Sequence, residues 1–225
     1  MGVYLYAICG DDAAVPGDVS GFDGAPLRMV RAGGLAALVS DRSSAPPEPR
    51  EDTLWEHERV VEALMAGHDL LPARFGTELD SDAAVAELVL SRAEEFRSAL
   101  AYVAGAAELG VRAACVGDLA PSIRLLPEAH AGHGYFAQRI GVHQRVRALA
   151  DRVEQALGPL ARAHTIRMPA PTSATISAAF LVAHERIDEF AHRAAALDAE
   201  IVDGRVFCTG PWPPYSFSNA AGRGR

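Results

Sequence analysis

Short apolar runs and longer amphipathic stretches alternate along the chain, and this pattern predicts strands and helices in both halves. In the first half, the β-branched and aromatic runs at 3–9, 27–31 and 35–40 are typical of strands. Gly33-Gly34 separates the last two runs and suits the tight turn of a hairpin. The chain therefore begins with three predicted strands.

A first helix is predicted after these strands. The segment Thr53–Glu56 has the pattern of a capping box, which marks a helix start. The helix that it opens places Leu54, Val61 and Leu64 on one side, so this side is expected to face the core.

A second and longer helix follows a short extended piece at 69–77. Asp80 or Ser81 is its predicted cap, because both side chains can accept hydrogen bonds from the first turn. Apolar residues recur at helical spacing from Val85 to Val103. The first half thus has three strands, a helix, a short strand and a second helix.

The second half shows its own order of elements. Strands are predicted at 109–116, 165–168, 174–182 and 201–209, and helices at 135–163 and 187–197. This order, βαββαβ, is that of a ferredoxin-like domain, in which two helices cover one face of a four-stranded antiparallel sheet. We therefore predict an α+β fold with two domains: a mixed α/β domain at 1–107 and a ferredoxin-like domain at 108–217, with a disordered tail at 218–225.

Composition restricts the classes of function. The 225 residues are 49% hydrophobic and 22% charged, which is ordinary for a folded domain. The formal net charge is −8, so nucleic acids and anionic membranes are repelled at long range. No apolar run has the roughly 18 residues needed to span a bilayer, and the start of the chain lacks the basic region of a secretory signal. We expect a cytoplasmic protein with no membrane span and no nucleic-acid partner.

The three cysteines, Cys9, Cys115 and Cys208, lie far apart in apolar, strand-like runs. A disulfide framework or a metal site would require closer pairs. The spacing therefore predicts buried free thiols.

No motif for phosphate binding or nucleophilic catalysis is present, since the chain has no lysine for a Walker A loop and no G-x-S-x-G elbow. His130 and His133 either share a metal ion or are solvated loop histidines, and no third ligand is evident near them. His57-Glu58 is either an acid–base pair or a structural contact of the first helix. Without a convergent set of nucleophile, base and oxyanion donors, we predict no enzyme, no cofactor and no metal site.

The segment Pro72–Thr77 combines three chemically distinct residues. Arg74 supplies a charge, Phe75 an apolar anchor and Gly76 the conformational freedom for a turn with positive φ. Two interpretations remain open: a junction that holds a strand to a helix, or a binding element.

The last ordered run, Gly210–Phe217, has three prolines interleaved with three aromatic residues, and we call it the strap. Proline fixes φ and donates no backbone hydrogen bond, so an extended segment that leaves the sheet is expected. Trp212, Pro213, Pro214, Tyr215 and Phe217 would either cover apolar surface of the protein itself or bind another protein.

Four segments together resemble one known family. They are Val3–Ile8 (VYLYAI), Leu71–Thr77 (LPARFGT), Ser177–Val182 (SAAFLV) and Gly210–Phe217 (GPWPPYSF). Their order and spacing are similar to those of the gas vesicle accessory family GvpF/GvpL over nearly the whole length, and the terminal motif is the most specific.

The resemblance implies a non-enzymatic minor component or assembly factor of gas vesicles, with a ferredoxin-like C-terminal half. It implies as partners the very hydrophobic major shell protein GvpA and other gas vesicle accessory proteins. On this hypothesis the chain limits aggregation of GvpA, and the protein-binding residues are those of the strap, Trp212, Pro213, Pro214, Tyr215 and Phe217, with Arg74, Phe75 and Gly76.

One alternative from another class stays open. Ferredoxin-like domains also bind small molecules between helices and sheet, and fold does not fix function. The alternative prediction is a regulatory module that binds a small molecule.

Overall fold

The computed structural model describes residues 2–42, 47–115, 131–168, 175–202 and 204–218, and within the first helix of the second half it leaves the side chains at 131–140, 142 and 143 undescribed. The contacts divide the chain into two compact units. One unit combines residues 1–107 with the residues from Trp212 on, and the other comprises Glu108–Pro211.

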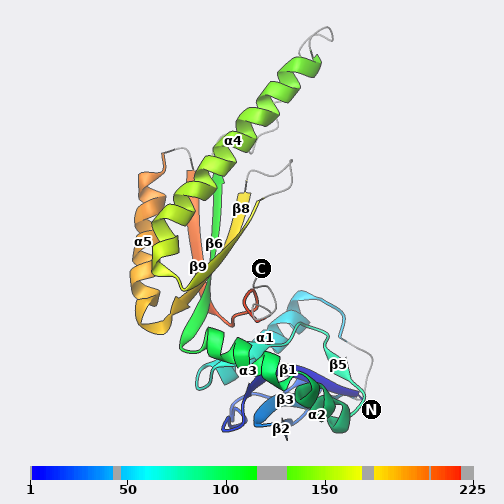
Figure 1. Cartoon of the computed structure of the whole chain (residues 1–225). Coiled ribbons are helices and arrows are strands. Elements are labelled where there is room, and N and C mark those ends of the chain that lie inside the picture. The colour runs from blue at the N-terminus through cyan, green and yellow to red at the C-terminus, as the bar shows by residue number, and fades with distance from the viewer. Residues whose placement is uncertain (1, 43–46, 116–130, 169–174, 203, 219–225) are drawn as a thin grey trace. The chain divides into compact units, whose positions relative to one another are not determined.

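The first unit is built on an antiparallel sheet (Figure 1). Its strands are β1 (Gly2–Gly10), β2 (Leu27–Ala32), β3 (Leu35–Arg42), β4 (Leu70–Pro72) and β5 (Glu78–Leu79). Among the described residues the order is β2-β3-β1-β4, and β5 also pairs with β1. The hairpin between β2 and β3 turns at Gly33 and Gly34, whose φ values of 58° and 72° lie in the left-handed region that glycine adopts without strain.

The helices of this unit are α1 (Glu51–Met65), α2 (Asp82–Ser91) and α3 (Ala93–Val103). Two details of the prediction were wrong. The capping box has Arg50 as the N-cap and Thr53 at the third helical position, where Thr53 Oγ1 accepts from Arg50 N–H at 3.1 Å. The single long helix after Ser81 is two helices, because the backbone leaves helical geometry at Arg92 (φ −119°, ψ 19°).

Both faces of the first sheet are covered. Residues that alternate along the strands, such as Tyr4, Tyr6 and Leu38, form one core with Val60 and Leu64 of α1. The residues between them are also buried, and α2 and α3 contact β1–β4. A strand that is buried on both faces reads as a continuous apolar run, as β1 does in the sequence.

The second unit has the element order that the sequence predicted. The elements are β6 (Ala106–Cys115), α4 (Ala131–Leu157), β7 (Ala163–Arg167), β8 (Thr175–Ala183), α5 (Ile187–Glu200) and β9 (Gly204–Trp212), with strand order β7-β8-β6-β9. Figure 1 shows α4 and α5 side by side over this sheet. Short 3-10 turns lie at Phe22–Gly24 in the first unit and at Gly158–Leu160 and His184–Arg186 in the second.

The core of the second unit lies between its two helices and its sheet. Phe180 of β8 is fully buried and packs against Phe190 of α5 in a tilted arrangement, with ring centroids 5.1 Å apart. Val153 and Leu157 of α4 are buried against the same layer. Helix α4 runs from Ala131 to Leu157, so the predicted helix at 135–163 began too late and ended too late. Its end lies directly before Gly158-Pro159, because proline cannot continue a helix.

The strap differs from its prediction in two respects. Strand β9 continues through Pro211 to Trp212, and the peptide bond Gly210-Pro211 is cis. Proline is tolerated there because β9 is an edge strand and needs no donor on its outer side. The prediction placed the strap in the second domain, but residues from Trp212 on make their contacts in the first unit. The tail predicted at 218–225 lies, apart from Ser218, outside the described residues.

Two of the three cysteines are buried as predicted, and the third is not fully buried. Cys9 and Cys115 are buried and Cys208 is half-buried, and none of the three forms a disulfide. Cys9 Sγ donates a weak hydrogen bond to Ala36 O at 3.5 Å, so this thiol serves the packing of the first sheet.

Candidate functional site

Segments far apart in the sequence meet around one buried histidine of the first unit. His57 lies on α1 and is only 2% exposed. Its neighbours are Tyr4 and Tyr6 of β1, Phe75 after β4, and Tyr215 of the strap, with ring centroids 5.6–6.5 Å from the imidazole. We call these five residues the histidine cluster. Three of the four segments that carry the family resemblance contribute to it.

Two consecutive hydrogen bonds connect the backbone of Gly76 to His57 through Tyr4. Gly76 N–H donates to Tyr4 Oη at 2.8 Å, and Tyr4 Oη lies 3.1 Å from His57 Nδ1. Because Tyr4 Oη accepts from Gly76, we assign its own proton to the bond with His57 Nδ1. The imidazole therefore carries its hydrogen on Nε2.

The other side of the imidazole binds the strap. His57 Nε2 lies 3.2 Å from Ala73 O and 3.1 Å from Tyr215 Oη, so its hydrogen is shared between these two acceptors. Tyr215 Oη donates to Glu58 Oε2 at 2.9 Å. Both nitrogens of His57 are thus used inside the protein, and the neighbouring Glu58 is engaged by the strap.

Burial sets the protonation states in the cluster. It lowers the pKa of His57 to about 4, and the hydrogen bond with Ala73 O opposes this shift only in part. It raises the pKa of Tyr4 to about 12. The pKa of Tyr215 is also raised by burial, and the Glu58 carboxylate adds to this effect. At pH 7 the imidazole and both phenols are therefore neutral.

The segment after β4 is a tight turn that holds one ring against the cluster. Thr77 N–H donates to Arg74 O at 3.1 Å, and Gly76 has a φ of 80°, which a residue with a Cβ adopts only with strain. Phe75 is half-buried in the cluster, whereas Arg74 and Gly76 are exposed. The turn therefore joins β4 to β5, not a strand directly to a helix as one interpretation expected, and it also presents a charge to solvent.

The strap packs against its own unit. Pro213, Pro214 and Phe217 are buried, and Trp212 and Tyr215 are half-buried. Tyr215 N–H donates to Pro213 O at 2.8 Å and Phe217 N–H to Pro214 O at 3.1 Å, so the strap folds into consecutive turns. Its buried members cover apolar surface of the first unit, and two of its rings keep part of their surface in solvent.

An exposed apolar pair beside the strap was missed by sequence reasoning. Trp55 is 56% exposed and Leu54 is 44% exposed, both in the first turns of α1. They precede Glu58, which binds Tyr215, by about one helical turn. Leu54 had been assigned to the buried side of the helix. Trp55 lies outside the apolar stripe of α1, and that position was the signal that could have identified it.

The remaining questions from the sequence concern the metal ligands and a membrane span. His130 and His133 lie outside the residues whose side chains the structure describes. Among the side chains that are described, no group of three or more His, Cys, Asp or Glu residues could hold a metal ion. In the described part of the chain, no helix is both long and apolar enough to cross a membrane.

The fold of this chain is shared by two solved structures. A crystal structure of the gas vesicle protein GvpF from Anabaena sp. PCC7120 superimposes with a TM-score of 0.83, covering 96% of this chain and 95% of that one at 23% sequence identity. A crystal structure of GvpF from Microcystis aeruginosa gives a TM-score of 0.80, with 96% and 98% of the two chains covered at 22% identity. The chain thus has the same fold as these two GvpF structures.

Sequence comparison identifies the family. The sequence model described as gas vesicle synthesis protein GvpL/GvpF matches residues 2–219, so the chain belongs to this family. Gas vesicle protein L of Streptomyces sp. (strain CB03234) is 31% identical and covers 97% of this chain and 93% of its own length. Gas vesicle protein F of the same strain is 30% identical, with 96% and 99% covered. The chain is thus similar to both an L and an F protein, at nearly equal identity.

Proposed function

We propose that this protein is an accessory factor of gas vesicle assembly that binds the hydrophobic shell protein GvpA in the cytoplasm and limits its aggregation. On this proposal it is a non-enzymatic, minor vesicle component that also contacts other accessory proteins. The observation that carries the proposal is the exposed pair Leu54 and Trp55, on the helix that anchors the strap, in a chain of the GvpL/GvpF family.

The physical mechanism is the temporary covering of apolar surface. A subunit made for a gas-filled wall exposes more apolar area than a dispersed monomer tolerates in water. A partner with a matching apolar patch removes that area from water, at about 25 cal/mol for each Å². The net charge of −8 on this chain then keeps the complexes apart by repulsion.

We propose that the contact surface comprises Leu54 and Trp55 with the exposed parts of Trp212, Tyr215 and Arg74. Aromatic and arginine side chains carry much of the binding energy at protein interfaces. The buried residues of the predicted set, Pro213, Pro214, Phe217 and Phe75, would shape this surface, and Gly76 would hold the turn beneath it. Since Tyr215 binds Glu58 at 2.9 Å, the strap and the start of α1 form one rigid support.

We further propose that the second unit is a ferredoxin-like domain that comprises residues 108–211. The sheet order β9-β6-β8-β7 corresponds to the fourth, first, third and second strands of the unit, which is the order expected for that fold. The antiparallel pairing of β7 with β8 and the two helices over the sheet support this. An experimental structure in which β6 and β8 run parallel would contradict it.

The test is suppression of aggregation by purified protein. Denatured GvpA is diluted into buffer with and without this chain, and light scattering is followed over time. We expect the wild-type chain to delay scattering in proportion to its concentration, and the double variant Leu54→Ser, Trp55→Ser to lose most of the effect. Leu90→Ser is the matched control, because Leu90 is also exposed in the first unit but lies on α2.

Two results would count against the proposal. If the wild-type chain neither binds GvpA nor delays scattering, the accessory function is wrong. If the α1 double variant and the Leu90 variant behave alike, the function stands but the surface lies elsewhere. A thermal shift with small metabolites, with no effect of GvpA, would instead favour the regulatory module.

A further inference from the structure

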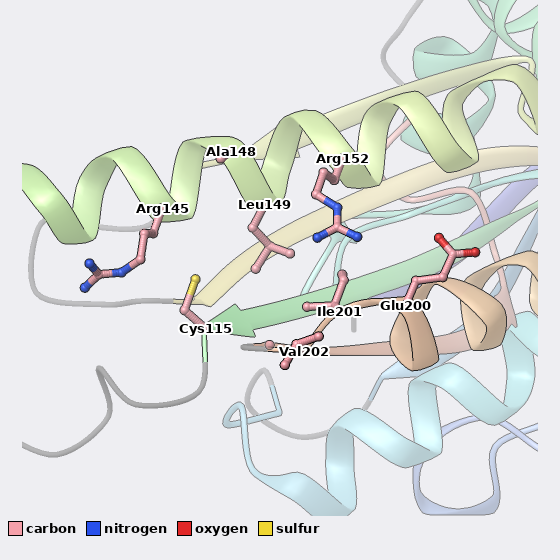
Figure 2. Close-up of a pocket in the computed structure, with 9 residues that line it drawn as sticks. Cys115, Arg145, Ala148, Leu149, Arg152, Glu200, Ile201 and Val202 are labelled. Atoms are coloured by element: carbon pink, nitrogen blue, oxygen red, sulfur yellow. The ribbon is translucent and has the colours of Figure 1, made fainter.

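The sheet of the second unit has one face that its two helices leave open. Helices α4 and α5 cover the other face, and Figure 2 shows Leu149 projecting from α4 toward Ile201 on that covered side. Side chains that alternate with core residues along a strand point away from the helices. Phe207 of β9 is such a residue, since Val206 and Cys208 on either side of it pack in the core. It is 65% exposed, more than any other described aromatic side chain.

Each of the other three strands also places an exposed side chain on this open face. Arg112 of β6 and Ser177 of β8 are exposed and alternate with core residues of their strands. Arg167 of β7 is exposed and is the cross-strand partner of Ser177, so it lies on the same face. With the strand order β7-β8-β6-β9, the face presents Arg167, Ser177, Arg112 and Phe207 from one edge to the other.

The ring and one of the arginines are direct neighbours. Thr209 Oγ1 donates to Gly110 O at 3.4 Å, and Gly204 lies close to Ala114 O, so β9 and β6 are antiparallel. Two residues along from the contact at Thr209, Phe207 is therefore opposite the exposed arginine of β6, about 5 Å away across the sheet. Strand β8 separates the two arginines of the face, which are thus at least about 10 Å apart.

The two guanidiniums of the open face have no acidic partner in the described part of the chain. Neither Arg112 nor Arg167 forms an ion pair or hydrogen bond there. Glu108, the acidic residue that β6 places on this face, is half-buried and lies about 13 Å from Arg112 along the strand. Other arginines of the unit are paired with carboxylates at 2.8–3.2 Å: Arg186 with Glu189, Arg193 with Glu200 and Arg205 with Asp198. The open face therefore carries unpaired positive charge in a chain with a net charge of −8.

We propose that the open face binds an acidic, extended segment of a protein partner. Two carboxylates of the segment bind Arg112 and Arg167, because a guanidinium binds a carboxylate through two parallel hydrogen bonds. An aliphatic side chain of the segment covers Phe207 and removes its ring from water. A second copy of this chain does not fit, since two such faces would oppose like charges. The site lies in the second unit and is independent of the GvpA-binding surface proposed for the first.

Single-stranded RNA is the other anion that a sheet face of this kind can bind. Sheets that bind RNA stack two or three bases on aromatic rings, whereas the described part of this face has one exposed ring, Phe207. The net charge of −8 also repels a continuous chain of phosphates more strongly than a short segment with two carboxylates. The charges and the single ring therefore favour a protein segment.

The test uses the full-length chain and a fluorescein-labelled peptide of 13 residues, with Glu at its fourth and eighth positions, Leu at its tenth, and Ser, Thr and Gln elsewhere. These three positions share one face of an extended segment, and the two carboxylates are about 13 Å apart. Fluorescence anisotropy at low salt measures the dissociation constant. We expect saturable binding that weakens as salt rises, about tenfold or more with Arg112→Glu or Arg167→Glu, and about threefold or more with Phe207→Ser.

Arg147→Glu is the matched control, because it makes the same charge change at an exposed position of α4, in the layer that covers the other face of the sheet. Circular dichroism checks that each variant is folded. Absence of saturable binding, or equal effects of Arg112→Glu and Arg147→Glu, would overturn the proposal. So would tighter binding of a fluorescein-labelled decauridylate than of the peptide, which would show a site for nucleic acid.

Discussion

Replacing Tyr215 with phenylalanine removes one oxygen atom from the histidine cluster and leaves the ring in place. That oxygen takes part in two hydrogen bonds, at 3.1 Å with His57 Nε2 and at 2.9 Å with Glu58 Oε2. We expect the Tyr215→Phe variant to be folded but less stable, with a strap that leaves the first unit more often.

The magnitude follows from the two bonds. A hydrogen bond to a carboxylate contributes about 1.5–3 kcal/mol and a neutral one about 0.5–1.5 kcal/mol. We use the lower end of each range for the Tyr215→Phe variant. In that variant Ala73 O still accepts from His57, and water can reach Glu58 because residue 215 is only half-buried. The expected loss in free energy of unfolding is about 2 kcal/mol, which corresponds to a fall in Tm of about 4–8 °C for a chain of this length.

Thermal and urea unfolding at pH 7, followed by circular dichroism, measure this loss. A double-mutant cycle with Glu58→Gln isolates the bond to the carboxylate, and the expected coupling energy is about 1 kcal/mol. Glu56→Gln is the control, because it removes an exposed charge from the same helix. Limited proteolysis should also cleave the strap faster in Tyr215→Phe than in the wild type.

The reasoning fails if Tyr215→Phe unfolds within about 0.5 kcal/mol of the wild type, or if its effect adds to that of Glu58→Gln without coupling. Either result would mean that the strap is held by apolar packing alone. Phe217 and the two buried prolines would then account for its position.

Three further predictions concern the same cluster, the turn beside it and the core of the second unit. The pKa of His57 is about 4 in the folded protein against an ordinary 6.5, so the unfolded chain takes up the proton first as pH falls. The free energy of unfolding should therefore drop by up to about 3 kcal/mol between pH 6.5 and 4. If urea unfolding of His57→Gln showed the same dependence on pH as the wild type, this prediction would be contradicted. Gly76→Ala should lose about 1 kcal/mol because of its φ of 80°, whereas Gly67→Ala should stay within about 0.5 kcal/mol of the wild type, and equal urea midpoints of the two variants would refute the argument. Phe180→Ala should lose about 3–5 kcal/mol from the core of the second unit, and a loss below about 1.5 kcal/mol would show that the site repacks.

Local patterns in the sequence predicted most of the elements, because period and turn chemistry act over a few residues. The runs that form β1, β2, β3, β8 and β9 are rich in apolar and β-branched residues. Gly33 and Gly34 adopt the positive φ values that the turn between β2 and β3 requires. The break between α2 and α3 was missed, since Ser91-Arg92-Ala93 has neither proline nor glycine and the apolar spacing continues through it.

The candidate site depended on contacts that a sequence does not display. His57 could be interpreted only as an acid–base residue or a helix contact, because Tyr4 and Tyr215, which bind its two nitrogens, are 53 and 158 residues away along the chain. The same distance explains why the strap was assigned to the unit that precedes it. Leu54 was placed in the core from helical spacing, which cannot tell whether a neighbouring element covers the first turn.

The return of the chain to its first unit has a consequence for biosynthesis. His57 leaves the ribosome 158 residues before Tyr215, which at about 5–20 residues per second is a delay of roughly 8–30 s. During that interval the nascent chain carries the imidazole and Glu58 without their last partner. The first unit is therefore closed only after the 158 residues from His57 to Tyr215 have been made, and a polypeptide released before Tyr215 would lack that closure.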